Sequence, residues 1–203
     1  MTIISDTTMT SAATDGNSQP LDVLEWVNEA AAWMTPDRVV WCDGSPGEAK
    51  RLKEEMVESG TLIALNSKKR PRSFLARSEP SDVARVEART FVCSTDPVDA
   101  GPTNNWIDPE SMKATLQEAS KGSMKGRTLY VVPFSMGLLQ SPLARCGVQI
   151  TDSPYVVLSL HLMVRVSTTV LDAIAAGRSW TKGTHTVGAP LEAGEIDSSW
   201  PCN

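Results

Sequence analysis

Residues 39–65 read VVWCDGSPGEAKRLKEEMVESGTLIAL, in which a strand-like run is followed by a helix signal and a second strand-like run. The first run, Val39–Cys42, is apolar and ends at the turn-forming pair Asp43-Gly44. A helix start is predicted at Ser45-Pro46-Gly47-Glu48, because it offers an N-cap hydroxyl, proline at the first helical position and a carboxylate three residues after the cap.

The predicted helix has an apolar face and is followed by another strand. Ala49, Leu52 and Met56 lie on one side of it, and Gly60 suits its C-terminal cap. The strand at Thr61–Leu65 completes an alternation of strand, helix and strand. This rhythm predicts an α/β fold in which helices flank a mixed sheet.

Other segments extend the same alternation. Apolar residues at steps of three and four predict a helix from Leu21 that stops before Thr35-Pro36. The segment Tyr155–Val166 alternates between apolar and more polar side chains, which predicts a long strand with His161 on its polar face. Further predictions are strands at Ser73–Ala76 and Thr128–Val132, an extended segment at Val86–Cys93, and helices at Pro109–Ala119 and Thr169–Ala176.

The composition is that of a folded intracellular chain. Of its 203 residues 41% are hydrophobic, which is enough for a core, while residues 1–20 are polar and predict a flexible tail before a domain at 21–203. The net charge of −5 gives no overall attraction to nucleic acid or anionic lipid. The four cysteines form no Cys-x-x-Cys pair, and no secretory leader or long apolar run is present. We therefore expect a reduced, cytoplasmic protein with no nucleic-acid or membrane partner.

Few residues stand out as candidates for chemistry. The loop Lys121–Arg127 precedes a strand and lacks the Lys-Ser/Thr of a phosphate loop, so it is interpreted as a solvated basic turn. His161 and His185 do not have the spacing of a metal pair and are interpreted as structural or solvated. Arg85 could grip a carboxylate with both arms of its guanidinium, although composition alone favours an Arg–Glu ion-pair ladder on a sheet face.

Several long blocks of the chain match one family, in the same order and over nearly the whole length. They are Cys42-Asp43-Gly44-Ser45, Ser78–Glu87, Asp99–Trp106, Met124–Gly137, Thr151–Val157 and Trp200–Asn203. These blocks resemble the bacterial GTP-dependent phosphoenolpyruvate carboxykinases. The resemblance implies the N-terminal, substrate-side domain of that fold, incomplete at its C-terminal end.

The resemblance also implies a reaction, the lyase step of gluconeogenesis that converts oxaloacetate and GTP to phosphoenolpyruvate, CO2 and GDP with Mn2+ or Mg2+. In the family, the Arg of the Asp-Val-Ala-Arg motif binds the substrate carboxylate, which implies this role for Arg85. The family's Tyr-Gly-Gly motif, metal ligands, phosphate loop and lid lie further along its chains. We therefore expect no catalytic, metal-binding or nucleotide-binding residue here, and neither metal nor GTP bound by this chain alone.

The expected partners are oxaloacetate or phosphoenolpyruvate and a missing C-terminal nucleotide-binding domain, in a family that is usually monomeric. Departures from the family pattern gather in the C-terminal third, where Leu160–Ser167 replaces the usual Met-Arg-Ile-Met-Thr-Arg-Met-Gly. An N-terminal fragment that is inactive alone is therefore expected. A non-catalytic dicarboxylate- or anion-binding module and a degenerate remnant stay open as alternatives. The net charge opposes a nucleic-acid contact through Lys68–Arg72.

Overall fold

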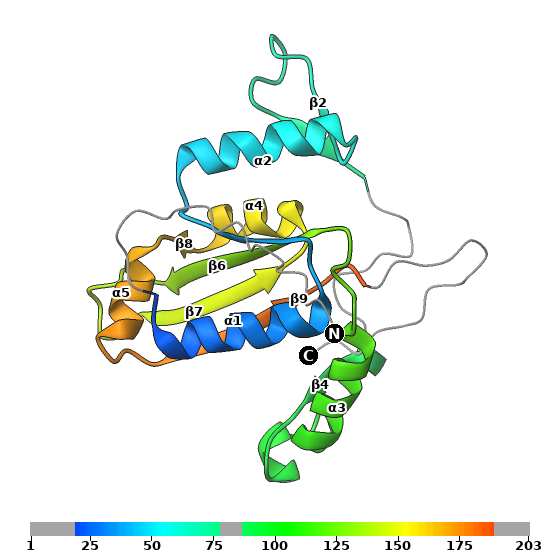
Figure 1. The fold of residues 1–203 in the computed structure, drawn as a ribbon, viewed down its shortest axis with the longest axis vertical. Helices are drawn as coiled ribbons and strands as arrows, with labels where there is room; N and C mark the ends of the chain where they lie inside the picture. Colours follow the sequence, from blue (N-terminus) through cyan, green and yellow to red (C-terminus); the bar gives the residue numbers. More distant parts are fainter. Residues whose placement is uncertain (1–18, 78–86, 189–203) are drawn as a thin grey trace, which may run out of the picture.

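The computed structural model describes residues 19–77 and 87–188, which build a mixed five-stranded sheet with helices on both faces (Figure 1). The strand order is β1-β6-β7-β9, formed by Arg38–Trp41, Thr128–Met136, Arg145–Thr151 and Trp180–His185. β1 runs parallel to β6 and β9 parallel to β7, whereas β6 and β7 are antiparallel. β8, Arg165–Val166, pairs with β6 beyond the end of β1.

The central strand β6 is buried on both faces. Leu129 and Val131 belong to one hydrophobic core, and the intervening Tyr130 and Val132 belong to the other. Alternate side chains of a strand point to opposite faces, so one segment contributes to both cores. A strand covered on both sides carries a continuous apolar run, as β6 does.

The first core lies between the sheet and the helices α1, Leu21–Met34, and α5, Thr169–Ala175. Val23 and Val27 of α1 and Leu171 of α5 are almost fully buried there. α1 ends at Thr35, which adopts a left-handed conformation and donates its N–H to the carbonyl of Ala31. Pro36 follows and cannot continue the helix.

The second core lies on the opposite face, under α2, Pro46–Glu58, and α4, Pro154–Met163. Leu52 and Met56 of α2 pack there with Val157 of α4. In Figure 1 these two helices lie above the sheet and α1 lies below it, so the domain has three layers.

The remaining elements lie outside these layers. They are the antiparallel pair β2, Leu62–Ala64, and β3, Phe74–Ala76; the parallel pair β4, Phe91–Val92, and β5, Asn105–Trp106; the short helices Glu87–Arg89 and Pro97–Ala100; and α3, Pro109–Ser120. α3 is joined to α1 by a 2.6 Å hydrogen bond from the Trp33 indole to the carbonyl of Gln117. No helix within residues 19–77 and 87–188 is long and apolar enough to cross a bilayer.

The prediction of a long strand at Tyr155–Val166 is wrong, because this segment forms α4 up to Met163 and only Arg165–Val166 is extended. Ser153 caps the helix by accepting from the Val156 N–H, and Pro154 occupies its first turn. The helix is largely apolar, with Ser159 and His161 as its polar side chains, and such a segment satisfies an alternating pattern as readily as a helical one.

The prediction of an extended segment at Val86–Cys93 is also wrong for most of its described part, while Val86 itself lies outside the described residues. Residues Glu87–Arg89 form a 3-10 turn, and only Phe91–Val92 is a strand. The other predicted helices and strands are confirmed, with β6 continuing to Met136. The tail predicted at 1–20 lies almost wholly outside the described residues.

Candidate functional site

The turn Cys42–Ser45, part of the first block that resembles the carboxykinase family, is organised around a buried carboxylate. Glu48, 4% exposed, accepts the Asp43 N–H at 2.9 Å and the Gly44 N–H at 3.3 Å. Ser45 Oγ in turn accepts the Glu48 N–H at 3.0 Å, which confirms the predicted helix start. A standard capping box returns the carboxylate to the N-cap N–H. Here it reaches one and two residues further back and fixes the turn itself.

The third partner of this carboxylate comes from the neighbouring helix α4. His161 Nε2 of α4 lies 2.7 Å from Glu48 Oε1, and both side chains are buried, with 10% and 4% of their surfaces exposed. An ionised carboxylate only accepts hydrogen bonds, so this contact places the imidazole proton on Nε2. The predicted polar, strand-borne position of His161 is therefore wrong, whereas its structural role is supported.

The pKa values of two neighbouring side chains in the turn, Cys42 and Asp43, are shifted in opposite directions. Burial raises the pKa of the Cys42 thiol well above its ordinary value, and the Glu48 carboxylate raises it further. Burial also acts to raise the pKa of Asp43, but hydrogen bonds from Ser45 outweigh it and the pKa is lowered. Cys42 is consequently protonated at neutral pH and unsuited to nucleophilic attack.

A second buried carboxylate joins the start of β6 to the segment after β9. Asp152, whose side chain is fully buried, accepts from Arg127 Nη1 at 2.6 Å, from Thr186 Oγ1 at 3.1 Å and from the Val187 N–H at 2.9 Å. Arg127 also donates to the carbonyls of Ser123 and Gly188. The prediction that this basic turn is solvated is wrong for Arg127, whose guanidinium binds Asp152 and two backbone carbonyls within the domain.

His185 lies at the edge of this cluster. Its Nδ1 is 2.8 Å from Thr151 Oγ1. Burial lowers the pKa of His185, although the Asp152 carboxylate acts to raise it. The side chain is held by one neighbouring hydroxyl, which agrees with the structural interpretation made from the sequence.

Arg85, the predicted substrate-binding residue, lies outside the described residues. The described chain resumes two positions later, at Glu87, where the backbone is tied to β5. Asn105 Nδ2 donates to the carbonyl of Glu87 at 2.8 Å and to that of Thr90 at 3.1 Å. These bonds anchor Glu87 and Thr90 to the β4–β5 pair.

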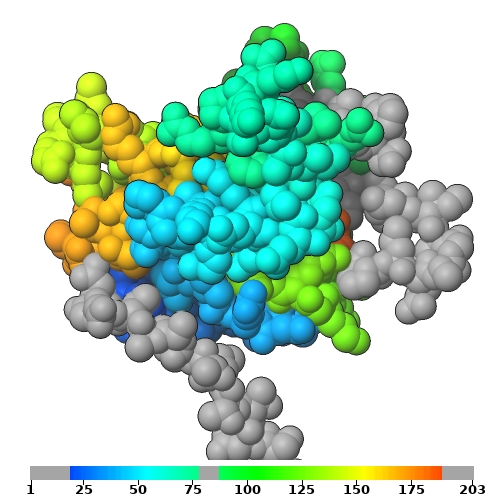
Figure 2. All heavy atoms as spheres, turned by 90° about the horizontal axis from the view of Figure 1, so that it is seen from above, coloured from blue at the N-terminus to red at the C-terminus, as the bar shows by residue number. Residues whose placement is uncertain are grey.

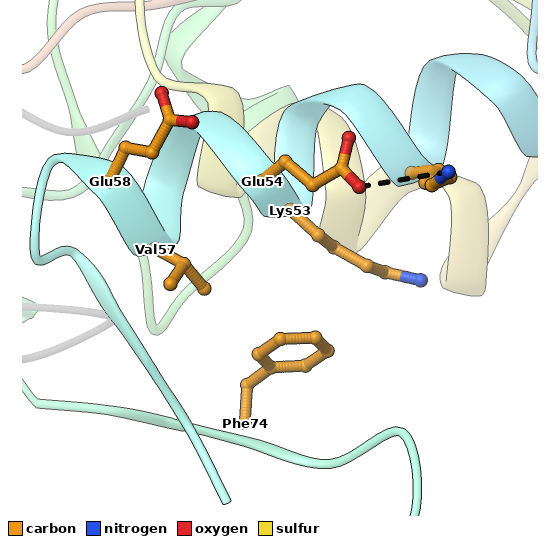
Figure 3. A pocket seen from close by; sticks show the side chains of 6 residues that line it. Lys53, Glu54, Val57, Glu58 and Phe74 are labelled. Carbon is orange, nitrogen blue, oxygen red and sulfur yellow. Dashed lines mark ion pairs between the residues drawn. The ribbon is translucent and has the colours of Figure 1, made fainter.

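A shallow groove of about 310 Å3 lies between α2 and β3. Figure 3 shows the ring of Phe74 facing Val57 and the aliphatic part of Lys53. Lys50 and Glu54 form an ion pair of 3.7 Å at its rim, and both side chains are exposed to solvent. No buried polar group points into this groove from the lining residues, so its chemistry does not suit a reacting centre.

The residues in 19–77 and 87–188 contain no group of three or more His, Cys, Asp or Glu side chains that could hold a metal ion. Both buried carboxylates, Glu48 and Asp152, are already occupied by N–H and guanidinium donors. This part of the chain therefore does not fit the divalent cation that the family resemblance implies, and no reaction step is assigned to a metal here.

The fold and its polar clusters define a mixed α/β domain in which the buried charges of the described residues hold loops and helices together. The chain matches the family model described as "Phosphoenolpyruvate carboxykinase N-terminal domain" over residues 25–203, and it belongs to this family. The membership confirms the fold expected from the resemblance.

Three similar proteins carry the name "Phosphoenolpyruvate carboxykinase [GTP]". The protein of Corynebacterium jeikeium (strain K411) is 54% identical over 182 residues, covering 90% of this chain and 30% of the relative. That of Corynebacterium efficiens is 54% identical over 202 residues, with 96% and 33% covered. That of Corynebacterium glutamicum (strain R) is 54% identical over 182 residues, with 90% and 30% covered. The chain thus spans about a third of the length of these relatives.

Proposed function

We propose that this chain is the N-terminal, substrate-side part of a GTP-dependent phosphoenolpyruvate carboxykinase, the gluconeogenic lyase that converts oxaloacetate and GTP to phosphoenolpyruvate, CO2 and GDP. The observation that carries the proposal is the 54% identity to carboxykinases of Corynebacterium over 90% of the chain. The domain at 21–203 then represents the portion that holds the substrate, and the remaining two thirds of the relatives' length supplies the rest of the active site.

Within this proposal, Arg85 binds a carboxylate of oxaloacetate or phosphoenolpyruvate. A guanidinium can form two parallel hydrogen bonds to one carboxylate, which fixes both the position and the orientation of the substrate. Such positioning matters because the enolate oxygen formed on decarboxylation must stay within reach of the γ-phosphate of GTP. GTP and Mn2+ or Mg2+ supply the phosphoryl group and charge neutralisation when they are bound.

The chain alone is proposed to bind substrate weakly and to have no turnover. A single bidentate, charge-assisted contact contributes about 1.5–3 kcal/mol, which supports only low affinity. The described chain is held from Glu87 onward, because Asn105 bonds the carbonyls of Glu87 and Thr90. In this proposal the chain positions the substrate through Arg85, and the rest of the polypeptide is needed for catalysis.

Binding is tested by calorimetric titration of the purified chain with phosphoenolpyruvate or oxalate. Arg85→Ala is expected to weaken binding by about 10- to 100-fold, and the matched control Arg77→Ala, which removes an exposed arginine, to leave it unchanged. Binding that is indifferent to Arg85→Ala would remove Arg85 from the site.

The activity test uses a chimera in which residues 1–203 are followed by the part of the Corynebacterium jeikeium protein beyond its matched region. We expect GTP- and Mn2+-dependent carboxykinase activity in the chimera and none in the chain alone. A folded but inactive chimera that still binds dicarboxylate would favour the non-catalytic anion-binding module. A folded chimera with neither property would favour a degenerate remnant.

A further inference from the structure

Large apolar side chains are exposed together at one end of the sheet. They are Met136, Leu138, Leu143, Leu162 and Met163, with 59%, 60%, 81%, 86% and 78% of their surfaces exposed. We refer to these five side chains as the hairpin-end face. Isolated exposed apolar residues are ordinary on a protein surface, whereas a contiguous group marks an interaction site.

The strand register explains why these residues are neighbours. Ser135 of β6 pairs with Arg165 of β8 in an antiparallel arrangement, so Met163, two residues earlier, lies beside the end of β6. Residues 137–144, which carry Leu138 and Leu143, follow that end directly. Figure 2 shows this connection as a yellow-green lobe that projects next to the gold atoms of the α4 region.

The helix α4 is more exposed than its apolar composition would lead us to expect. Apart from Ser159 and His161 its side chains are largely apolar, yet among its residues only Val157 is buried, and Leu162 and Met163 are exposed. A helix without a polar face is normally enclosed by protein. Further contacts are therefore required to cover the C-terminal half of α4.

We propose that the hairpin-end face is the surface on which the remaining two thirds of the relatives' polypeptide packs. This inference rests on the proposed function. The relatives are about three times longer than this chain, so they contain enough additional polypeptide to cover the face. Two exposed arginines, Arg145 and Arg165, pair with the last two residues of β6 and border the face. The covering surface accordingly has an apolar centre with carboxylates at its edge.

Two native methionines report on this face without any substitution. Met136 and Met163 are highly exposed, whereas Met34, Met56, Met112 and Met124 are at most 6% exposed. Oxidation of methionine to the sulfoxide follows exposure, so dilute peroxide distinguishes the two groups. In the 203-residue chain, Met136 and Met163 are expected to be oxidised first, as read by mass spectrometry of their peptides.

The decisive comparison is between this chain and the chimera with the Corynebacterium jeikeium protein. We expect oxidation of Met136 and Met163 to be roughly tenfold slower in the chimera, with the four buried methionines slow in both proteins. Unchanged rates in a chimera whose buried methionines are protected would overturn the proposal. Protection in the chain alone that increases with its concentration would also overturn it, because a second copy would then be the occupant.

A pair of substitutions gives an independent test. Leu162→Lys is expected to leave the melting temperature of the chain unchanged and to lower that of the chimera by about 5 °C, because only the chimera buries this side chain. Val98→Lys, at an 82% exposed position outside the face, is expected to change neither. Equal effects of Leu162→Lys on the two proteins would contradict the inference. Carboxykinase activity of the chimera tests the proposed function separately. An inactive chimera with protected methionines would contradict the proposed function and still support the packing surface.

Discussion

His161 Nε2 lies 2.7 Å from Glu48 Oε1 and joins α4 to the first turn of α2 across 113 positions of the chain. The same carboxylate holds the N–H groups of Asp43 and Gly44, so one buried side chain fixes both a helix–helix contact and the turn that enters α2. Removal of this group therefore disturbs both the contact between α2 and α4 and the turn that leads into α2.

Glu48→Gln is expected to lower the free energy of unfolding by about 3 kcal/mol, because the amide presents donors to groups that themselves donate and leaves part of a buried network unsatisfied. Urea denaturation measures the change. Glu54→Gln, on the exposed side of the same helix, is the matched control and should stay within about 0.5 kcal/mol of the unsubstituted chain. Equal stability of the two variants would show that the Glu48 network does not stabilise the fold.

Gly44→Ala is expected to destabilise the domain by at least about 2 kcal/mol. Gly44 has φ +75°, and a Cβ at this position would collide with the backbone carbonyl of Val166 in β8. Gly47→Ala provides the contrast, because Gly47 lies in the first turn of α2 and its Cβ would meet nothing closer than Ser45 Oγ at 3.6 Å. The Gly47 variant should be as stable as the unsubstituted chain or slightly more stable. Thermal unfolding of both variants separates the two outcomes.

Asp152→Asn is expected to lower the free energy of unfolding by about 3–5 kcal/mol, since it leaves the partly buried Arg127 without its carboxylate partner. The amide proton of Val187, which donates to Asp152, should also exchange faster with solvent. Asp99→Asn, at an exposed position, is the control for loss of one negative charge. Unchanged exchange at Val187 in the Asp152 variant would argue against this hydrogen bond.

The stability of the domain is expected to fall as the pH decreases through 6.5, in part because of His185. Burial lowers its pKa below the ordinary value of 6.5, so the folded protein binds this proton less readily than the unfolded chain does. The contribution is fully present above pH 6.5 and is lost as the pH falls towards the folded pKa. His185→Gln should reduce the slope of stability against pH in this window, as measured by urea denaturation at a series of pH values. A slope identical to that of the unsubstituted chain would contradict the assignment.

Local signals were sufficient for most of the N-terminal half of the fold. The stop of α1 before Pro36 and the start of α2 at Ser45 depend on backbone chemistry within a few residues, and both were predicted. The alternating leucines of α4 predict a strand, whereas Ser153 and Pro154 just before them provide the helix-start signal that the structure follows. β7 was not predicted, although Cys146, Val148 and Ile150 alternate at strand spacing.

The polar clusters depend on contacts that no local pattern specifies. Glu48 was predicted as a capping residue, but its partner His161 comes from a helix that packs against α2 only in the folded domain. The basic turn around Arg127 predicts a solvated guanidinium, yet Asp152, 25 positions away, becomes its neighbour through the pairing of β6 with β7.

The amino-acid sequence by itself determined the α/β class, the family resemblance and the starts and stops of several helices, because each follows from residues that are close together in the chain. Only the tertiary structure decided which groups bind the side chains of Glu48, Arg127 and Asp152 and which side chains form the hairpin-end face. Strand register and helix packing bring distant residues together, and the burial that results sets both their hydrogen-bond partners and their exposure.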